Sequence, residues 1–516
     1  MSLILDSVQN PDEIAIRDAA GVLTWREVSN LLDRAVTRLS ALGIGRGARL
    51  AVFAENSLET VTAHLAALLI GAASVPVNFH LTAREVADIL ADAGAHLILV
   101  GPETATTGVE AARLVDGCRV LGWRCADRLD VEEWTCSHAD ADAVRATRTA
   151  RPYPNVLYTS GTTGSPKATE LPPTMFAGGD TVEEHLMLLR TQATMASGAS
   201  TVPGTHLVVG PLYHTGPLCA YRLLAGGTPV VVLGRFDAEQ TLAAIDKFSI
   251  ASTSMVPTHF RRLLSLSPAI RNMYDVSSLR HVWTTGAACP PALKQAMIDW
   301  WGPVISEAYG ATEVGTVTSI SATQWLGHKL SVGRCIPPFE ALVVDEDGNQ
   351  LPTNQVGRLY FRDATGRGVV YVNDAAKTAA AHLAPGVFTL GETGYVDDEG
   401  YVYITDRVTD MVISGGVNIY PAEAEKVLSA HPAVHDVAVI GVPDPDMGEA
   451  LMGLIVLNPE STLTGDDLIS FCRDRLAHYK CPSRIEFRPT LERSELGKLN
   501  KQRLRAPYWP SARTIG

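Results

Sequence analysis

The segment from residue 158 to 168 has the residue types of a loop that wraps oxyanions. It reads Tyr-Thr-Ser-Gly-Thr-Thr-Gly-Ser-Pro-Lys-Ala and follows a short apolar strand predicted at residues 155–158. Its glycines let main-chain N–H groups approach phosphate oxygens, its hydroxyls donate further hydrogen bonds, and Lys167 adds a positive charge. It is not a Walker loop, because Ser165 and Pro166 stand between the second glycine and the lysine. By composition alone it could be an ordinary surface loop, but the residue types favour a nucleotide phosphate site.

Alternating helices and strands would position this loop. Capping-box patterns at 24–27 and 82–85 each open a helix. A strand is predicted at 48–53, a helix at 58–70 and another strand at 96–100. This alternation indicates a parallel sheet covered on both faces, and therefore an α/β fold.

The pattern changes along the rest of the chain. Residues 101–150 carry little periodicity and are interpreted as a variable connection. Residues 340–361 read as short strands with turn signals, which indicates antiparallel structure. Helices are predicted at 421–430 and 465–476, and strands at 434–442 and 451–457. We expect an N-terminal domain at 1–408 and a small α+β domain at 409–516.

Composition limits the possible functions. The chain has 516 residues, too many for one ordinary core, and its 43 basic and 56 acidic side chains give a charge of −13 that argues against nucleic-acid binding. None of the eight cysteines forms a Cys-x-x-Cys pair, so we expect reduced thiols in the cytoplasm. The first residues lack a secretory pattern, and the longest apolar stretch is too short to span a membrane. The oligomeric state is left open.

Further motifs follow the phosphate loop in a fixed order. They are Pro211–Gly216, Thr285–Ala288, Tyr309–Glu313, Gly391-Glu392 with Thr405–Arg407, Ser414–Pro421 and Arg493–Lys498. Each could be merely structural: an isolated histidine is usually a satisfied polar residue, and a lysine near a C-terminus is usually solvated. Together, however, they resemble the adenylate-forming superfamily of acyl-CoA synthetases, aryl-CoA ligases, peptide-synthetase adenylation domains and luciferases. The resemblance covers nearly the whole chain.

The resemblance implies the fold and a set of site residues. The large domain would include a β-barrel-like part, and the small domain would be mobile about a hinge at Asp410. Lys498, Thr312, Glu313 and Lys167 would be catalytic. The nucleotide and coenzyme A would be held by Thr159, Ser160, Gly161, Thr162, Thr163, Gly164, Lys167, Gly286, Ala287, Ala288, Tyr309, Gly310, Ala311, Thr312, Glu392, Arg407, Gly415, Gly416 and Lys498.

The resemblance also assigns individual roles. Tyr309 would stack on adenine, and Glu313 would bind magnesium, with Thr159 as a further ligand. The acyl pocket would be lined by His214, Met255, Gly315, Thr316 and Val317.

The ribose motif departs from the family pattern. Glu392 replaces an aspartate, Leu390 replaces a threonine, and Asp406 replaces the glycine before Arg407. A lost hydrogen bond to a charged group costs about 1.5–3 kcal/mol. We therefore expect weaker nucleotide binding.

The resemblance implies an ATP-dependent acyl-CoA ligase with magnesium as cofactor. A carboxylic acid would become an acyl adenylate, and its acyl group would then pass to the thiol of coenzyme A. Three alternatives stay open: loading of a carrier protein in place of coenzyme A, thioester formation only from a ready-made acyl adenylate, or a catalytically silent nucleotide-binding regulator. The sequence does not identify the acid.

Overall fold

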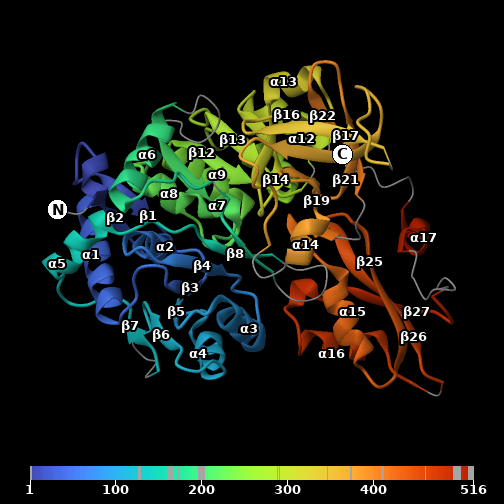
Figure 1. The fold of residues 1–516 in the computed structure, drawn as a ribbon, viewed down its shortest axis with the longest axis horizontal. Coiled ribbons are helices and arrows are strands. Elements are labelled where there is room, and N and C mark those ends of the chain that lie inside the picture. The colour runs from blue at the N-terminus through green and yellow to red at the C-terminus, as the bar shows by residue number, and fades with distance from the viewer. Residues whose placement is uncertain are drawn as a thin grey trace.

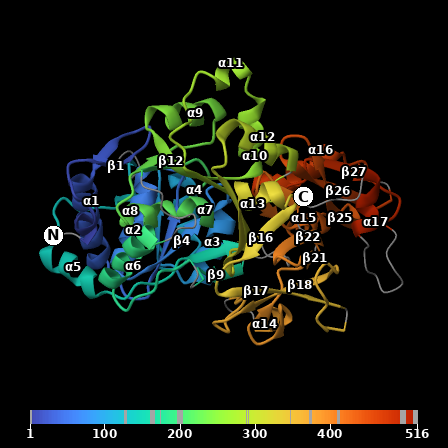
Figure 2. The same ribbon diagram turned by 90° about the horizontal axis from the view of Figure 1, so that it is seen from above.

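A large N-terminal domain and a small C-terminal domain make up this mixed α/β protein (Figure 1). The computed structural model describes residues 3–125, 130–159, 167–172, 175–195, 204–287, 289, 291–345, 347–371, 375–407, 412–459, 461–491 and 501–509. In every view the small domain lies at the opposite end of the molecule from α1 (Trp25–Ala41) (Figure 2). The predicted α/β class is confirmed.

One parallel sheet belongs to the first part of the chain. Its strand order is β4 (Ala73–Val77), β3 (Arg49–Phe53), β5 (Leu97–Val100), β6 (Arg119–Gly122) and β7 (Glu132–Glu133). Helices α3 (Ala83–Ala93) and α4 (Ala105–Arg113) pack on one face, and α2 (Leu58–Leu69) packs on the other. Both faces are buried, which explains the continuous apolar strands.

The prediction of a variable connection over residues 101–150 is wrong. This part of the chain forms α4, β6 and α5 (Ala141–Ala146), and β6 pairs in parallel with β5. The β6 strand is only four residues long and begins with an exposed arginine, Arg119. A strand this short gives little periodicity to detect.

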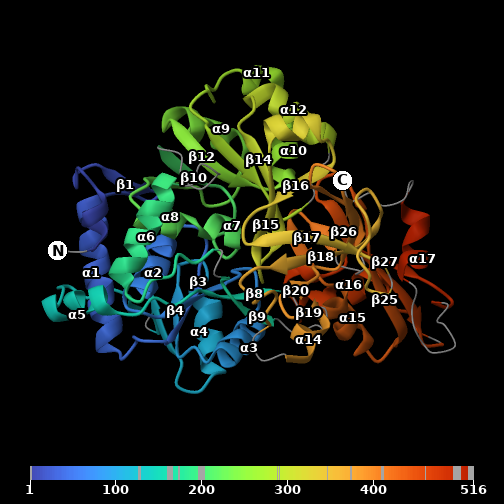
Figure 3. The ribbon, with the colours of Figure 1, turned by 45° about the horizontal axis from the view of Figure 1, so that its top comes forward.

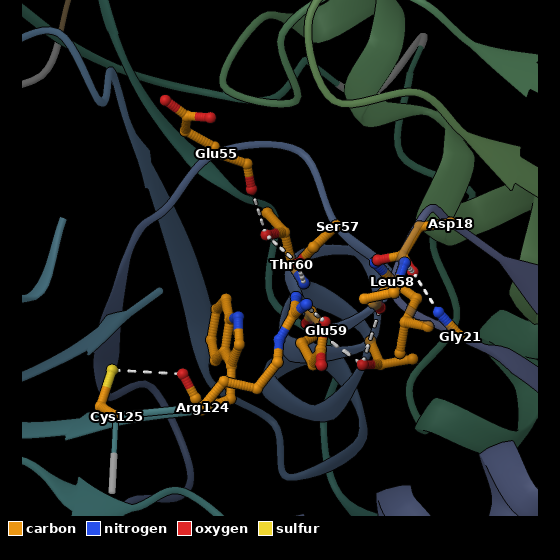
Figure 4. Close-up of polar contacts among 12 residues, drawn as sticks. Asp18, Gly21, Glu55, Ser57, Leu58, Glu59, Thr60, Arg124 and Cys125 are labelled. Carbon is orange, nitrogen blue, oxygen red and sulfur yellow. Dashed lines mark hydrogen bonds and ion pairs between the residues drawn. The ribbon is translucent and has the colours of Figure 1, made fainter. Parts of the chain in front are cut away.

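Helix α2 runs between two sheets and has a well-defined start. The Ser57 hydroxyl accepts a hydrogen bond from the Thr60 N–H at 3.1 Å, and the Asp18 carboxylate accepts one from the Leu58 N–H at 3.0 Å (Figure 4). An ion pair of 2.8 Å joins Glu59 to Arg124, although burial raises the pKa of Glu59. These contacts satisfy N–H groups that a helix start otherwise leaves unpaired.

A 15-stranded sheet forms the rest of the large domain. Its parallel strands are β1 (Ile14–Arg17), β11 (Val230–Val232), β10 (Thr205–Val208), β12 (Ile250–Met255), β13 (His281–Thr284) and β14 (Ile305–Ala311). The remaining strands pair antiparallel and are β2 (Val22–Thr24), β15 (Gly315–Ser321), β16 (Ser331–Cys335), β17 (Phe339–Val344), β18 (Gly357–Asp363), β19 (His382–Ala384), β20 (Val387–Phe388), β21 (Glu392–Val396) and β22 (Tyr401–Arg407). The antiparallel structure predicted at 340–361 is therefore confirmed.

Helices cover both faces of the parallel strands. On one face α9 (Ala238–Lys247), α10 (Pro257–Ser265), α11 (Pro268–Arg271) and α12 (Pro291–Trp301) gather at one side of the domain (Figure 3). The short helices α7 (Thr215–Leu218) and α8 (Ala220–Ala225), together with α6 (Val182–Met195), lie toward the first sheet, where α8 packs on α2. Helix α7 lies against the end of β12, since a Cβ on Gly216 would lie 3.1 Å from Oγ of Ser254.

The small domain is a second α+β unit. Its sheet has the order β24 (Val417–Ile419), β23 (Val412–Ser414), β26 (Gly448–Leu457) and β25 (Val434–Asp444), with β27 (Arg484–Phe487) beside β26. Helices α15 (Pro421–Ser429) and α16 (Gly465–Arg473) pack on one face of this sheet. The four elements predicted here from periodicity are confirmed to within a few residues.

Smaller elements complete the fold. They are α13 (Ala322–Gly327), α14 (Ala375–Ala380), α17 (Lys501–Arg505) and single 3-10 turns at Leu3–Ser7, Thr147–Thr149, His478–Lys480 and Ala506–Tyr508. The eight cysteines are free thiols. Within the described ranges, none of the helices combines the length and the apolar character needed to cross a membrane.

Candidate active site

Tyr309 and Glu392 meet where the parallel and antiparallel strands of the large sheet adjoin. The Tyr309 hydroxyl donates a hydrogen bond of 2.8 Å to Oε2 of Glu392. Glu392 is only 5% exposed, and it stands opposite Arg407 in the β21–β22 ladder. The predicted adenine and ribose residues therefore lie side by side. The side chain of Arg407 lies outside the described part of the structure.

The turn between β14 and β15 carries Thr312 and Glu313. The main chain passes so close to itself here that a Cβ on Gly310 would clash with the carbonyl oxygen of Gly315, so a side chain is excluded at this position. Arg367 Nη1 donates to the main-chain oxygen of Glu313 at 3.3 Å. These two contacts hold the turn that carries the Glu313 carboxylate in place.

The Glu313 side chain has an unusual electrostatic environment. Burial raises the pKa of its carboxyl group, while the charge of Lys377 and a hydrogen bond from Tyr371 oppose that rise. Within the described residues, no group of three or more His, Cys, Asp and Glu side chains could enclose a metal. A single carboxylate still fits magnesium, which usually takes one or two carboxylates together with substrate phosphates.

The strands that flank the predicted phosphate loop pair as a hairpin, β8 (Val156–Thr159) and β9 (Lys167–Glu170). The Tyr158 hydroxyl donates to Asp92 of α3 at 2.7 Å, and Thr169 Oγ1 donates to the Val370 oxygen at 3.3 Å. Val370 precedes the tyrosine that bonds to the Glu313 carboxylate. The base of the loop is thereby tied to the Glu313 turn.

Some predicted residues lie outside the described part of the structure. They are Ser160, Gly161, Thr162, Thr163, Gly164, Ala288, Asp410 and Lys498, together with the side chains of Thr159 and Lys167. Their assigned roles stay predictions.

The predicted acyl-pocket residues fall into two groups. Met255 ends β12, and its oxygen accepts a hydrogen bond from the Thr285 N–H at 3.3 Å. Gly216 of α7 approaches Thr285 so closely that an added Cβ would lie 3.7 Å from the Cγ2 atom. His214 precedes α7, so it lies near these strand ends. Val317 instead lies in a separate apolar cluster with Tyr309, away from the cluster that contains Met255.

His214 is a neutral imidazole over the ordinary pH range. Burial, with a smaller contribution from the charge of His80, lowers its pKa to about 4. Its Nε2 atom is buried and finds no hydrogen-bond partner among the described residues. A neutral ring suits a position beside an acyl group.

The glycine loop of the small domain contacts the large domain next to these strand ends. Gly415 and Gly416 have φ angles of +58° and +82°, which favour glycine. A Cβ on Gly416 would lie 2.8 Å from Cγ1 of Val256, and a Cβ on Gly286 would lie 3.5 Å from the Gly416 oxygen. The loop therefore packs between the end of β12 and the turn after β13, which carry Met255 of the predicted acyl pocket and Gly286 of the predicted nucleotide site.

A neighbouring turn of the small domain is also anchored. Arg262 Nη2 lies 2.9 Å from the Asp446 carboxylate, and Arg261 Nη1 donates to the Asp446 main-chain oxygen at 2.6 Å. The sequence did not indicate these residues, nor the Arg367, Tyr371 and Lys377 that surround Glu313, because no motif contains them.

Comparison with known proteins shows the family of this chain. A family model of AMP-binding enzymes matches residues 6–369, and a model of the AMP-binding enzyme C-terminal domain matches residues 423–498. The chain belongs to the AMP-binding enzyme family, in the acyl-CoA ligase branch of the adenylate-forming superfamily, and is thus an AMP-forming acid–thiol ligase.

Individual relatives cover almost the whole chain. A feruloyl-CoA synthase from Amycolatopsis sp is 32% identical over 509 residues, which are 97% of this chain and 96% of the relative. A fatty acid–[acyl-carrier-protein] ligase from Streptomyces coeruleorubidus is 30% identical over 517 residues, 98% of this chain and 95% of the relative. An amide bond synthetase structure from Marinactinospora thermotolerans has a TM-score of 0.84 at 26% identity, over 98% of this chain and 100% of that one.

Two solved structures of one enzyme differ in their similarity to this chain. A double mutant of o-succinylbenzoate CoA synthetase from Bacillus subtilis, bound to its product analogue OSB-NCoA, gives a TM-score of 0.77 at 25% identity, covering 98% of both chains. The same synthetase with its acyl-adenylate intermediate gives 0.62 at 25% identity, covering 99% of this chain and 98% of that one. This chain is therefore more similar to the structure that contains the coenzyme A product analogue.

Proposed function

We propose that this protein activates a carboxylic acid with ATP and transfers the acyl group to the thiol of coenzyme A. The observation that carries the proposal is the position of Gly415 and Gly416 against Val256 and Gly286. Paired glycines leave room for a narrow ligand to pass along the backbone. The pantetheine arm of coenzyme A would reach the acyl adenylate beside this loop.

In the first half-reaction, residues of the large domain would hold ATP and the acid. Tyr309 and Glu392 would contact the adenosine, while Thr312 and Lys167 would donate to phosphate oxygens. When bound at Glu313, magnesium would neutralise charge on the phosphates. Lys498 would stabilise the charge that builds on the α-phosphate when the acid attacks and pyrophosphate leaves.

In the second half-reaction, the thiol would attack the acyl carbon and AMP would leave. Asp410 would act as the hinge about which the small domain of residues 409–516 turns between the two steps. Neutral His214 and the Met255 end of β12 would line one side of the acyl group, and Gly315, Thr316 and Val317 would line another.

The test separates the two half-reactions. Acid-dependent pyrophosphate release should be followed by AMP release that depends on coenzyme A, with the thioester identified by mass spectrometry. The acid panel begins with ferulate and includes fatty acids, because the relatives include a feruloyl-CoA synthase and a fatty acid ligase. Pyrophosphate release without a coenzyme A thioester from any acid would overturn the proposed acceptor.

A different acceptor is the second candidate, favoured by the carrier-protein ligase among the relatives and by the amide bond synthetase structure. Incubation of the acyl adenylate with coenzyme A, a phosphopantetheinylated carrier protein or a simple amine would distinguish the three. Equal rates from synthetic acyl adenylate and from ATP with acid would remove the hypothesis that the protein performs only thioester formation.

A further inference from the structure

A buried lysine joins the two domains at a distance from the glycine loop. Lys480 ends the 3-10 turn His478–Lys480 of the small domain and is 3% exposed. Its Nζ lies 2.9 Å from Oε2 of Glu423 in α15 and 3.1 Å from Oε1 of Glu85 in α3. One ammonium group therefore binds a carboxylate from its own domain and another from the large domain.

The residues before Lys480 make two more contacts with the large domain. Asn78 Nδ2 donates a hydrogen bond of 2.9 Å to the hydroxyl of Tyr479. Ala477 is 2% exposed and packs into the apolar cluster beneath the first sheet of the large domain. The whole turn is thus docked on α3 and on the loop that precedes it.

The carboxylate of Glu85 also caps helix α3, and this cap holds the side chain in position. Its Oε2 accepts hydrogen bonds from the Thr82 N–H at 3.0 Å and the Thr82 hydroxyl at 2.9 Å, which form the capping box of α3. Its Oε1 is left to face Lys480. The cap therefore orients the carboxylate that the small domain meets.

The ion pair between Lys480 and Glu85 depends on how the two domains are placed. Although burial lowers the pKa of Lys480, Tyr479 and the carboxylates of Glu423 and Glu85 raise it above the ordinary value, so the lysine is charged. Lys480 and Glu423 belong to the same domain and stay paired when that domain turns. The bond to Glu85 breaks when the domains separate, and water then hydrates both groups. Because hydration offsets most of the pairing energy, such a pair can be exchanged readily.

We propose that Glu85 and Lys480 form a latch that holds the small domain in the thioester-forming arrangement. The proposal rests on the proposed two-step function and on the greater similarity to the structure that contains the coenzyme A product analogue. Both are positioning residues for the second half-reaction. Neither acts on ATP in the first.

The informative variant is Glu85→Gln, because glutamine also serves at this place in a capping box while removing the charge. A matched control exists in α1, where Oε2 of Glu27 accepts from the Thr24 N–H at 2.8 Å and the Thr24 hydroxyl at 3.0 Å. Glu27 is exposed, so Glu27→Gln changes an equivalent cap away from the docked turn. Lys480→Met removes the other partner.

The kinetic test compares the two half-reactions in the full chain, with the acid that gives the fastest pyrophosphate release in the panel. Thioester formation from the supplied acyl adenylate should fall about ten- to a hundred-fold in Glu85→Gln and Lys480→Met, as expected for a lost bond to a charged group. Pyrophosphate release should stay within about twofold of the wild type, a change too small to indicate a lost bond of this kind. Equal losses in both half-reactions would overturn the latch.

A second measurement needs no substrate, so its failure is distinguishable from failure of the proposed function. Brief acetylation of the native protein with sulfo-NHS acetate, followed by peptide mass spectrometry, reports the accessibility of each lysine. Lys480 should be protected in the wild type and in Glu27→Gln, and it should be labelled several-fold faster in Glu85→Gln. Unchanged labelling of Lys480 in Glu85→Gln would show that Glu85 does not hold the domain.

Discussion

Replacing Gly416 by alanine should slow thioester formation and spare adenylate formation. A Cβ at this position would lie 2.8, 3.0 and 3.2 Å from Cγ1, Cβ and Cγ2 of Val256. Val256 belongs to the large domain, where it precedes α10. The clash therefore exists only while the small domain is docked in the present arrangement.

Two separate costs set the size of the effect. Alanine at a φ of +82° costs about 1–2 kcal/mol, and the loop carries this cost in either arrangement. Overpacking against Val256 costs about 1–3 kcal/mol and applies only to the docked arrangement. Only the second cost changes the balance between arrangements, so we expect thioester formation to fall about 5- to 150-fold.

The assay measures AMP release from synthetic acyl adenylate with coenzyme A, and pyrophosphate release from ATP with the acid. Gly448→Ala is the control, because Gly448 of the small domain also has a φ of +82°, and its added Cβ would lie 4.0 Å from the Ile413 main-chain oxygen of the same domain. Any cost there is common to both arrangements. Gly448→Ala should therefore leave the ratio of the two rates close to that of the wild type.

A second substitution tests the cause. Val256→Ala removes the two methyl groups that the new Cβ would meet at 2.8 and 3.2 Å but keeps the Cβ at 3.0 Å, so the double variant should recover part of the lost thioester rate. The coupling between the two substitutions then measures the contact itself. If the double variant is as slow as Gly416→Ala, or if Gly416→Ala slows both half-reactions equally, the contact with Val256 is not the cause.

Three further predictions concern the first half-reaction. Tyr309→Phe removes the 2.8 Å hydrogen bond to buried Glu392. The KM for ATP, measured by pyrophosphate exchange, should therefore rise about ten- to a hundred-fold. An unchanged KM would argue against a contact between Glu392 and the nucleotide. Because burial raises the pKa of Glu313, this carboxyl group takes up its proton at a higher pH than an ordinary glutamate, and activity at limiting magnesium should fall as the pH is lowered toward that pKa. Glu313→Gln should lack this acid limb, and a profile identical to the wild type would argue against Glu313 as the magnesium ligand. Lys498→Ala should reduce pyrophosphate release about a hundred- to a thousand-fold while acyl adenylate is still converted to thioester; a similar loss in both steps would assign the lysine another role.

Local signals predicted much of the fold because they are complete within a few residues. The capping boxes at Thr24 and Thr82 start helices as expected, and each has both of its hydrogen bonds. The strand at 48–53 and the helix around Leu65 were also predicted, because both are almost entirely buried and therefore consist mainly of apolar residues. The sequence pattern of such an element is enough to predict it, and the tertiary contacts agree with that pattern.

Helix α4 shows why residues 101–150 were not predicted. Thr104 precedes this helix without donating or accepting a side-chain cap bond there, and the sequence Ala-Thr-Thr-Gly-Val-Glu-Ala-Ala-Arg has few large apolar residues. The side that packs closely is formed by small residues. A Cβ on Gly108 would lie 3.6 Å from Phe53 in the sheet, besides meeting Val100. Tertiary packing decides this helix, and a sequence pattern cannot show it.

The candidate site was only partly predictable for a similar reason. The resemblance assigned Tyr309 and Glu392 to the same nucleotide, but it could not show that the longer carboxylate side chain of Glu392 would bond directly to the tyrosine hydroxyl. It also gave no account of Arg367 and Tyr371, which fix the turn and the carboxylate of Glu313. Both residues come from a segment about 55 positions further along the chain, and only the folded strands bring them together.

The contact between Lys480 and Glu85 could not be predicted from the sequence. Glu85 lies 395 positions away from Lys480 and already has a role in the cap of α3. The sequence therefore offers no reason to look for a second role. The structure separates the two roles by oxygen atom, since Oε2 caps the helix and Oε1 meets the lysine. Glutamine at position 85 can keep the first contact and lose the ion pair, so a defect confined to thioester formation would have to come from the domain contact and not from the helix.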